Sequence, residues 1–272
     1  MKNGNNGKTK ETEVVRKPFL TGSVTDERTL KSSLAFFGVL IVVIFITLIA
    51  CATATFDIVI LRVLLNAAVI IVCLMIFYNK GAGYGSEAVS HGEILYQKKE
   101  KGQQVAESER KLCYHPAKGY VTGLIGTLPL LIPALILAVT TSVQMTGAGA
   151  LPSWMQAYTG RSDIGNALIN YTQPEGMKAV DYIRTVIRIC ILPYINIIGN
   201  ANKTGVLFLE RISPLIMLLP ATVYGTGYRT GKKIRTRIHT VISENDRKRV
   251  RREKKRIRDR NTTRAKGPEQ LN

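Results

Sequence analysis

Four uncharged stretches constrain this sequence more than any other feature. Asp, Glu, Lys and Arg are missing from residues 32–56, 63–79, 119–160 and 212–228, where most side chains are apolar. A bilayer core about 30 Å thick is crossed by roughly 20 helical residues, each adding about 1.5 Å. Backbone groups inside lipid must bond to one another, so such stretches become helices. The sequence therefore predicts an all-α integral membrane protein with four transmembrane helices.

The charge pattern divides the chain into five segments. Spans are expected at about Ser33–Thr53, Ile58–Tyr78, Tyr120–Val143 and Gly205–Tyr224. The predicted segments are a polar cytoplasmic N-terminal segment (1–32), a first transmembrane hairpin (33–78), a cytoplasmic linker (79–119), a second hairpin with an extracellular loop and interfacial segment at 144–204 (120–228), and a basic cytoplasmic tail (229–272).

The linker contains its own helix signals. Ser90 and Glu93 have the spacing of a capping box, which predicts a helix start at Ser90 and a charged helix over Glu93 to Leu112. Within it, Glu107 and Lys111 are placed for an ion pair one helical turn apart. We therefore expect a separate, charged helix on the cytoplasmic side.

Flanking charges give the orientation. The tail has 17 basic residues against 5 acidic ones, and the segment up to Ser32 has 7 against 4, whereas residues 144–182 have 2 against 3. Basic flanks stay in the cytoplasm, so both termini are predicted to lie on the cytoplasmic side of the cell (plasma) membrane. The number of crossings is then even. Residues 182–198 could form a fifth span, but that would put the basic tail outside. Gly176–Ile198 is therefore interpreted as an outer interfacial or re-entrant segment, consistent with amphipathic spacing from Gly176 to Ile191.

Polar residues inside the spans are the first candidate site. Arg62 and Asn66 lie in the second span, and Glu210 and Arg211 lie at a similar depth in the fourth. Ionisable groups at membrane depth are costly and therefore functional candidates. One hypothesis pairs Arg62 with Glu210, and the alternative has the charged side chains reach the outer headgroups. Asn66 is expected to bond to a neighbouring helix.

Small residues mark possible helix contacts. Gly123 and Gly126 offer a surface for close packing in the third span. The tetrapeptides Gly81–Tyr84 and Gly225–Tyr228 both read G-x-G-Y, each after an apolar helix. An internal duplication is one explanation. The favoured one is that Gly and Tyr are common where helices leave the bilayer.

The tail is the second candidate site. Ile234, Ile238 and Val241 have the spacing of an amphipathic helix lying on a membrane, and Ser243 is expected to begin a further helix. Each Lys or Arg near anionic lipid contributes about 1 kcal/mol, so anionic lipid headgroups are the favoured partner and nucleic acid the alternative. The expected contact residues are Lys232, Lys233, Arg235, Arg237, Arg247, Lys248, Arg249, Arg251, Arg252, Lys254, Lys255 and Arg256.

Motifs that carry chemistry are missing from the sequence. It has no phosphate-binding loop, no nucleophile elbow and no paired-cysteine zinc pattern, and Cys113 with His115 is too closely spaced for an ordinary metal site. We therefore expect no catalytic residue, cofactor or metal. The predicted function is a non-enzymatic transport or accessory subunit of a membrane complex, with an unidentified protein partner. The alternative is a membrane anchor or insertion factor whose basic tail recruits ribosomes, nucleic acid or anionic lipid.

Overall fold

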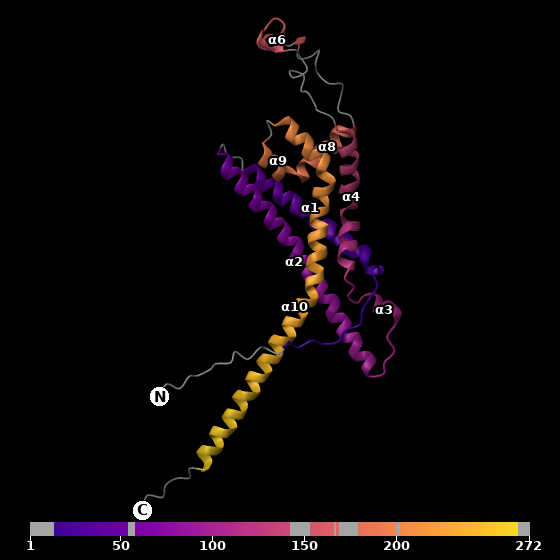
Figure 1. The fold of residues 1–272 in the computed structure, drawn as a ribbon, viewed down its shortest axis with the longest axis vertical. Coiled ribbons are helices and arrows are strands. Elements are labelled where there is room, and N and C mark those ends of the chain that lie inside the picture. The colour runs from indigo at the N-terminus through magenta and orange to yellow at the C-terminus, as the bar shows by residue number, and fades with distance from the viewer. Residues whose placement is uncertain are drawn as a thin grey trace, which may run out of the picture.

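The computed structural model describes residues 14–53, 58–141, 153–165, 167–168, 179–199 and 202–265, and every regular element in them is a helix. Four helices are long and apolar enough to cross a membrane: α1 (Glu27–Thr53), α2 (Val59–Glu100), α4 (Lys118–Thr140) and α10 (Lys203–Ala265). They form an elongated bundle that is broad at one end and drawn out at the other (Figure 1). The predicted all-α fold with four candidate spans is confirmed.

Two of these helices are much longer than a span. At 42 and 63 residues, α2 and α10 measure about 60 Å and 95 Å. The helix predicted to begin at Ser90 is therefore wrong, because α2 continues through the linker to Glu100. The helix start expected at Ser243 is also wrong, because α10 passes through it. At Ser90 the local start signal is overridden by the packing of α2 against α10.

The end of α2 leads into a short connection. Helix α3 (Glu107–Lys111) contains the predicted ion pair, with Lys111 Nζ 3.5 Å from Glu107 Oε1. An N-terminal arm, residues 14–22, runs along the same end of the bundle. Its backbone amides of Leu20 and Gly22 donate to the carbonyls of Gly92 and Tyr114, at 3.1 and 3.0 Å. We call this end, where the arm, α3 and the basic part of α10 gather, the arm end.

At the opposite end, two short helices fold back among the long ones. Helices α8 (Ala179–Cys190) and α9 (Leu192–Ile198) have 12 and 7 residues, about 18 and 10 Å, so neither can cross a bilayer alone. Ile187, Ile191 and Ile195 are buried in the core of the bundle. Pro193 lies in the first turn of α9, where its missing N–H leaves no helical hydrogen bond unmade. We call this the α8 end (Figure 1).

Parts of the predicted outer loop lie outside the described residues, including 142–152 and 169–178. So do the short connection at 54–57 and both chain ends, 1–13 and 266–272. Between them, α6 (Ser153–Gln156) and the 3₁₀ helix η1 (Ala157–Gly160) are described.

Helices α2 and α10 touch backbone to backbone through glycines. A Cβ on Gly81 would lie 2.2 Å from the Tyr224 carbonyl oxygen, and one on Gly227 would lie 2.2 Å from that of Tyr78. Only glycine permits this approach, as in small-residue crossings of membrane helices. The two contacts are reciprocal: a shift of 146 residues takes Tyr78 to Tyr224 and Gly81 to Gly227. The G-x-G-Y tetrapeptides, by contrast, are 144 residues apart. These glycines therefore build a helix crossing and do more than mark the end of a span.

The predicted small-residue surface of the third span is also used. A Cβ on Gly123 would lie 3.0 Å from Ala221 of α10, and one on Gly126 would lie 2.7 Å from the Ser33 carbonyl oxygen of α1. Helix α4 therefore packs closely against both neighbours, as expected.

Candidate functional site

Glu210 is the centre of a polar cluster at the α8 end. Only 1% of its side chain is exposed, and its carboxylate lies 2.6 Å from Nε of Arg188 and 3.3 Å from Nε of Arg184. Both arginines come from α8, one turn apart. Thr141, at the end of α4, donates to Glu210 and accepts from Arg184 at 2.8 Å. One carboxylate thus joins α10, α8 and the end of α4.

The predicted pairing of Arg62 with Glu210 is wrong. Within the described part of the chain, the ion pairs of Glu210 are those with Arg184 and Arg188. Arg62 lies beside α9, where a Cβ on Gly199 would be 3.4 Å from its Nη2, and its Nε is buried. Arg211 is exposed on the outside of α10. The sequence offered a signal for the true partners, because Arg184 and Arg188 share one face of an amphipathic helix.

Asn66 behaves as predicted. It is fully buried, and its Oδ1 accepts from Cys51 Sγ of α1 and from Asn196 Nδ2 of α9, both at 3.3 Å. Its own amide nitrogen donates to the Arg62 carbonyl at 2.8 Å. One side chain therefore bonds to two neighbouring helices, in a place where unmet polar groups would be costly.

Glu93 forms a second carboxylate cluster at the arm end. Its side chain is 7% exposed, with Nε of Arg235 at 2.9 Å and Nε2 of His239 at 2.8 Å. The two partners are again one helical turn apart, this time on α10. The sequence pattern predicted a capping box at Glu93 and a lipid contact at Arg235. It did not predict the ion pair between these two residues.

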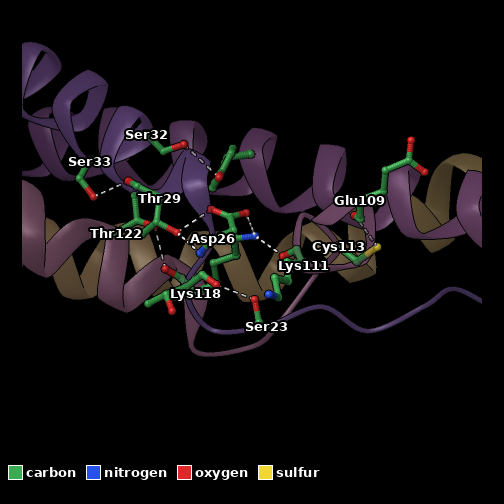
Figure 2. Close-up of polar contacts among 12 residues, drawn as sticks. Ser23, Asp26, Thr29, Ser32, Ser33, Glu109, Lys111, Cys113, Lys118 and Thr122 are labelled. Atoms are coloured by element: carbon green, nitrogen blue, oxygen red, sulfur yellow. Dashed lines mark hydrogen bonds and ion pairs between the residues drawn. The ribbon is translucent and has the colours of Figure 1, made fainter. Parts of the chain in front are cut away.

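Asp26 and Lys118 form a third buried ion pair, and each side chain is no more than 2% exposed. Figure 2 shows Lys118, from the start of α4, pointing toward Asp26, just before α1. Lys118 also donates to the Lys111 carbonyl at 3.1 Å, and Thr29 donates to Asp26 at 2.6 Å. Burial acts to raise the pKa of Asp26, but the hydrogen bonds from Lys118 and Thr29 outweigh it and hold the pKa below its usual value.

The basic tail is a continuation of a candidate span. Beyond His239, whose side chain is the last of α10 to contact Glu93, the helix runs on to Ala265, and residues 245–261 are exposed on every side. Ile234, Ile238 and Val241 are also exposed. Ten of the fourteen residues at 247–260 are Lys or Arg. The predicted contact residues therefore divide into a group beside α2, around Arg235, and a group on the exposed part of α10, from Arg247 to Arg256.

Two grooves lie between the N-terminal arm and the basic part of α10. One, of about 640 Å³, is lined by the arm, α2 and α10. The other, of about 740 Å³, continues along α10 to Lys254. They share Lys17, Arg235 and His239. By contrast, a cavity inside the bundle is small and apolar, about 80 Å³, and is lined by residues such as Leu40, Phe77 and Met217.

The cysteines of the described chain are all free thiols. Cys113 is fully buried, and its burial raises the pKa of the thiol despite the nearby Lys118 and Arg110. Among the described residues, no group of three His, Cys, Asp or Glu side chains is placed to hold a metal ion.

Comparison with known proteins finds no matching family model, no matching curated protein and no matching solved structure.

Proposed function

We propose that this protein is a non-enzymatic accessory subunit of a membrane complex, in which a four-span anchor holds a rigid basic helix in the cytoplasm for an acidic partner protein. The observation that carries the proposal is the continuity of α10 from Lys203 to Ala265. Because the tail and the fourth span are one helix, packing of the span in the bundle sets the direction of the tail. The charges of the tail therefore lie at a fixed place relative to the spans.

One feature supports the cytoplasmic side, and a second supports the placement of both termini on the same side. Basic residues predominate in both the N-terminal segment and the tail, which is typical of cytoplasmic flanks. The arm and the tail also meet, because the Val15 amide donates to Thr240 Oγ1 at 3.3 Å. Two terminal segments that touch lie on the same side of a membrane, which agrees with an even number of crossings.

Distance along the helix favours a partner in solution over the membrane surface. The uncharged stretch of α10 ends at Tyr228, and Arg247 to Arg260 lie 19 to 32 residues further on. At about 1.5 Å per residue this is roughly 30 to 50 Å, and salt screens charges beyond about 8 Å under cellular conditions. Although α10 changes direction below the bundle (Figure 1), a helix of this length that leaves the membrane carries these charges beyond the headgroups. We therefore replace the surface-lying helix expected from the sequence with a projecting one.

The inside of the bundle supports an anchor more than a transport path. Its buried charges, Glu210 and Arg184, are used in holding helices together. Among the described residues, the cavity lined by Leu40, Phe77 and Met217 is too small and too apolar to hold a hydrated ion or polar solute.

The proposal is tested by separating charge from rigidity. One variant replaces the basic residues of 247–260 with Gln, which keeps the helix. Another, Ile242→Pro, keeps every charge but breaks the helix just beyond the bond between Thr240 and the arm. Both should leave insertion and thermal stability unchanged and lose the protein that cross-links to the tail in native membranes. Retention of that protein by both variants would refute the proposal.

Recruitment of nucleic acid is the second candidate, because the exposed charges at 247–260 lie on all sides of the helix. A purified full-length protein that binds a defined RNA oligonucleotide with steep salt dependence, lost in the Gln variant, would favour it. Under the leading proposal this binding is weak, and the protein cross-link is the property that the Gln variant loses.

A further inference from the structure

The groove between the arm, α2 and α10 has a different position from the projecting helix. Lys232 and Lys233 lie only four and five residues beyond Tyr228, about 6 to 8 Å along α10. This is the depth of lipid headgroups when the uncharged stretch spans the hydrocarbon. The groove is therefore within reach of the membrane surface, in contrast to residues 247–260.

The arm adds cations to this groove. Its backbone is fixed on both sides, by the bond from Leu20 to Gly92 at 3.1 Å and the bond from Val15 to Thr240 at 3.3 Å. The fixed arm places Arg16 and Lys17 in the same groove as Lys232 and Lys233. Nζ of Lys232 also lies 5.3 Å from the centre of the Phe19 ring. Segments more than 200 residues apart in sequence thus bring four cations together.

In the described part of the chain, none of these four cations is paired with a carboxylate. Glu93 also lines the groove, but its two oxygens are engaged by Arg235 and His239. Among the described residues, no ion pair includes Arg16, Lys17, Lys232 or Lys233. The groove therefore has an excess of positive charge around the Glu93 cluster, and its volume is about 640 Å³.

We propose that this groove binds the phosphate headgroup of an anionic phospholipid, with Arg16, Lys17, Lys232 and Lys233 as its ligands. Basic pockets between helices at the cytoplasmic surface are suited to such headgroups. Pro18, Phe19 and Val89 give the groove an apolar side, which fits a ligand whose phosphate is joined to hydrocarbon. The proposal requires the four-span anchor and does not depend on the partner of residues 247–260.

The test compares two triple variants of the full-length protein in detergent. The groove variant carries Arg16→Gln, Lys17→Gln and Lys232→Gln. The matched control removes three exposed cations further along the same chain, Arg249→Gln, Arg252→Gln and Lys255→Gln. The probes are phosphatidylglycerol and cardiolipin against phosphatidylcholine, with bound lipid counted by native mass spectrometry and lipid-induced stabilisation measured by thermal unfolding.

Each cation beside a lipid phosphate strengthens attraction about fivefold, so the groove variant should bind anionic lipid on the order of a hundredfold more weakly. The control should bind as the wild type does. Equal losses in the two variants would show diffuse attraction to the whole basic region and overturn the proposal. Equal protection of the wild type by millimolar inorganic phosphate would identify a soluble phosphate as the ligand and overturn the lipid assignment. The exposed single change Lys17→Gln, expected to weaken binding about fivefold without threatening the fold, decides the matter if the triple variant does not fold.

Discussion

The clusters around Glu210 and Glu93 use the same arrangement in different surroundings. Each has one buried glutamate and two basic side chains one turn apart on a neighbouring helix. Glu210 belongs to the apolar bundle and has one buried arginine, Arg184, which is 6% exposed, beside the more exposed Arg188. Glu93 borders a water-facing groove, and its only arginine among the described residues, Arg235, is 27% exposed. Loss of Glu210 should therefore cost more stability than loss of Glu93, because a broken ion pair costs most where its remaining charge cannot reach water.

Removing Glu210 gives the largest expected effect. Glu210→Ala leaves Arg184 buried with its principal counter-charge gone, which should destabilise the fold by about 3–5 kcal/mol. Thermal unfolding in detergent and yield from membranes measure the loss. Glu253→Ala, on the exposed part of α10, is the matched control and should have no measurable effect. A Glu210→Ala protein as stable as wild type would show that the cluster is hydrated. It would contradict the expected difference in stability between the Glu210 and Glu93 clusters.

The glycine crossing lies between the two clusters and tests whether they are independent. Gly81→Ala puts a methyl group within 2.2 Å of the Tyr224 carbonyl, which must push α2 and α10 apart at a cost of about 1–3 kcal/mol. Gly83→Ala on the same helix faces open space and is the control. We expect cysteine cross-links between α2 and α10 near Glu93 to weaken, while those between α8 and α10 persist. Loss of both sets would mean that the bundle unfolds as one unit.

Removing Glu93 should have a smaller effect than removing Glu210. Glu93→Ala takes away two charged hydrogen bonds, but Arg235 can turn into water, so about 1–2 kcal/mol is expected. Glu87→Ala, exposed on the same helix, is the control. The two purified variants are compared with wild type by thermal unfolding. A loss as large as that of Glu210→Ala would show that the groove floor is as dry as the bundle.

The smallest expected effect is the pH dependence from Asp26. Because its pKa is lowered by folding, the stability it contributes is complete above its unfolded value near 3.8 and is lost as pH falls through the folded value. Asp26→Asn should therefore lose less stability than wild type between pH 5 and 3. Asp246→Asn, on the exposed helix, should follow the wild-type curve. Identical curves for Asp26→Asn and wild type would contradict a lowered pKa.

Sequence patterns predicted the elements that depend on local composition. The apolar stretches gave the four candidate spans, and Asn66, Gly123 and Gly126 were recognised as contact residues. Long-range pairing could not be predicted in the same way. Nothing near Glu93 in the sequence indicates His239, 146 residues away, and the capping-box pattern at Ser90 pointed to a different structure.

The sequence by itself determined that the chain is helical, that four of its helices can cross a membrane and that its positive charge gathers at the end. These properties follow from hydrophobicity and charge, which each residue contributes independently of its partners. The tertiary structure decided which cation neutralises Glu210, that α2 and α10 are continuous through their polar halves, and that the arm completes a basic groove. Those outcomes depend on which helices approach closely, and that approach is set by glycines at a crossing and by buried charges that must find a partner.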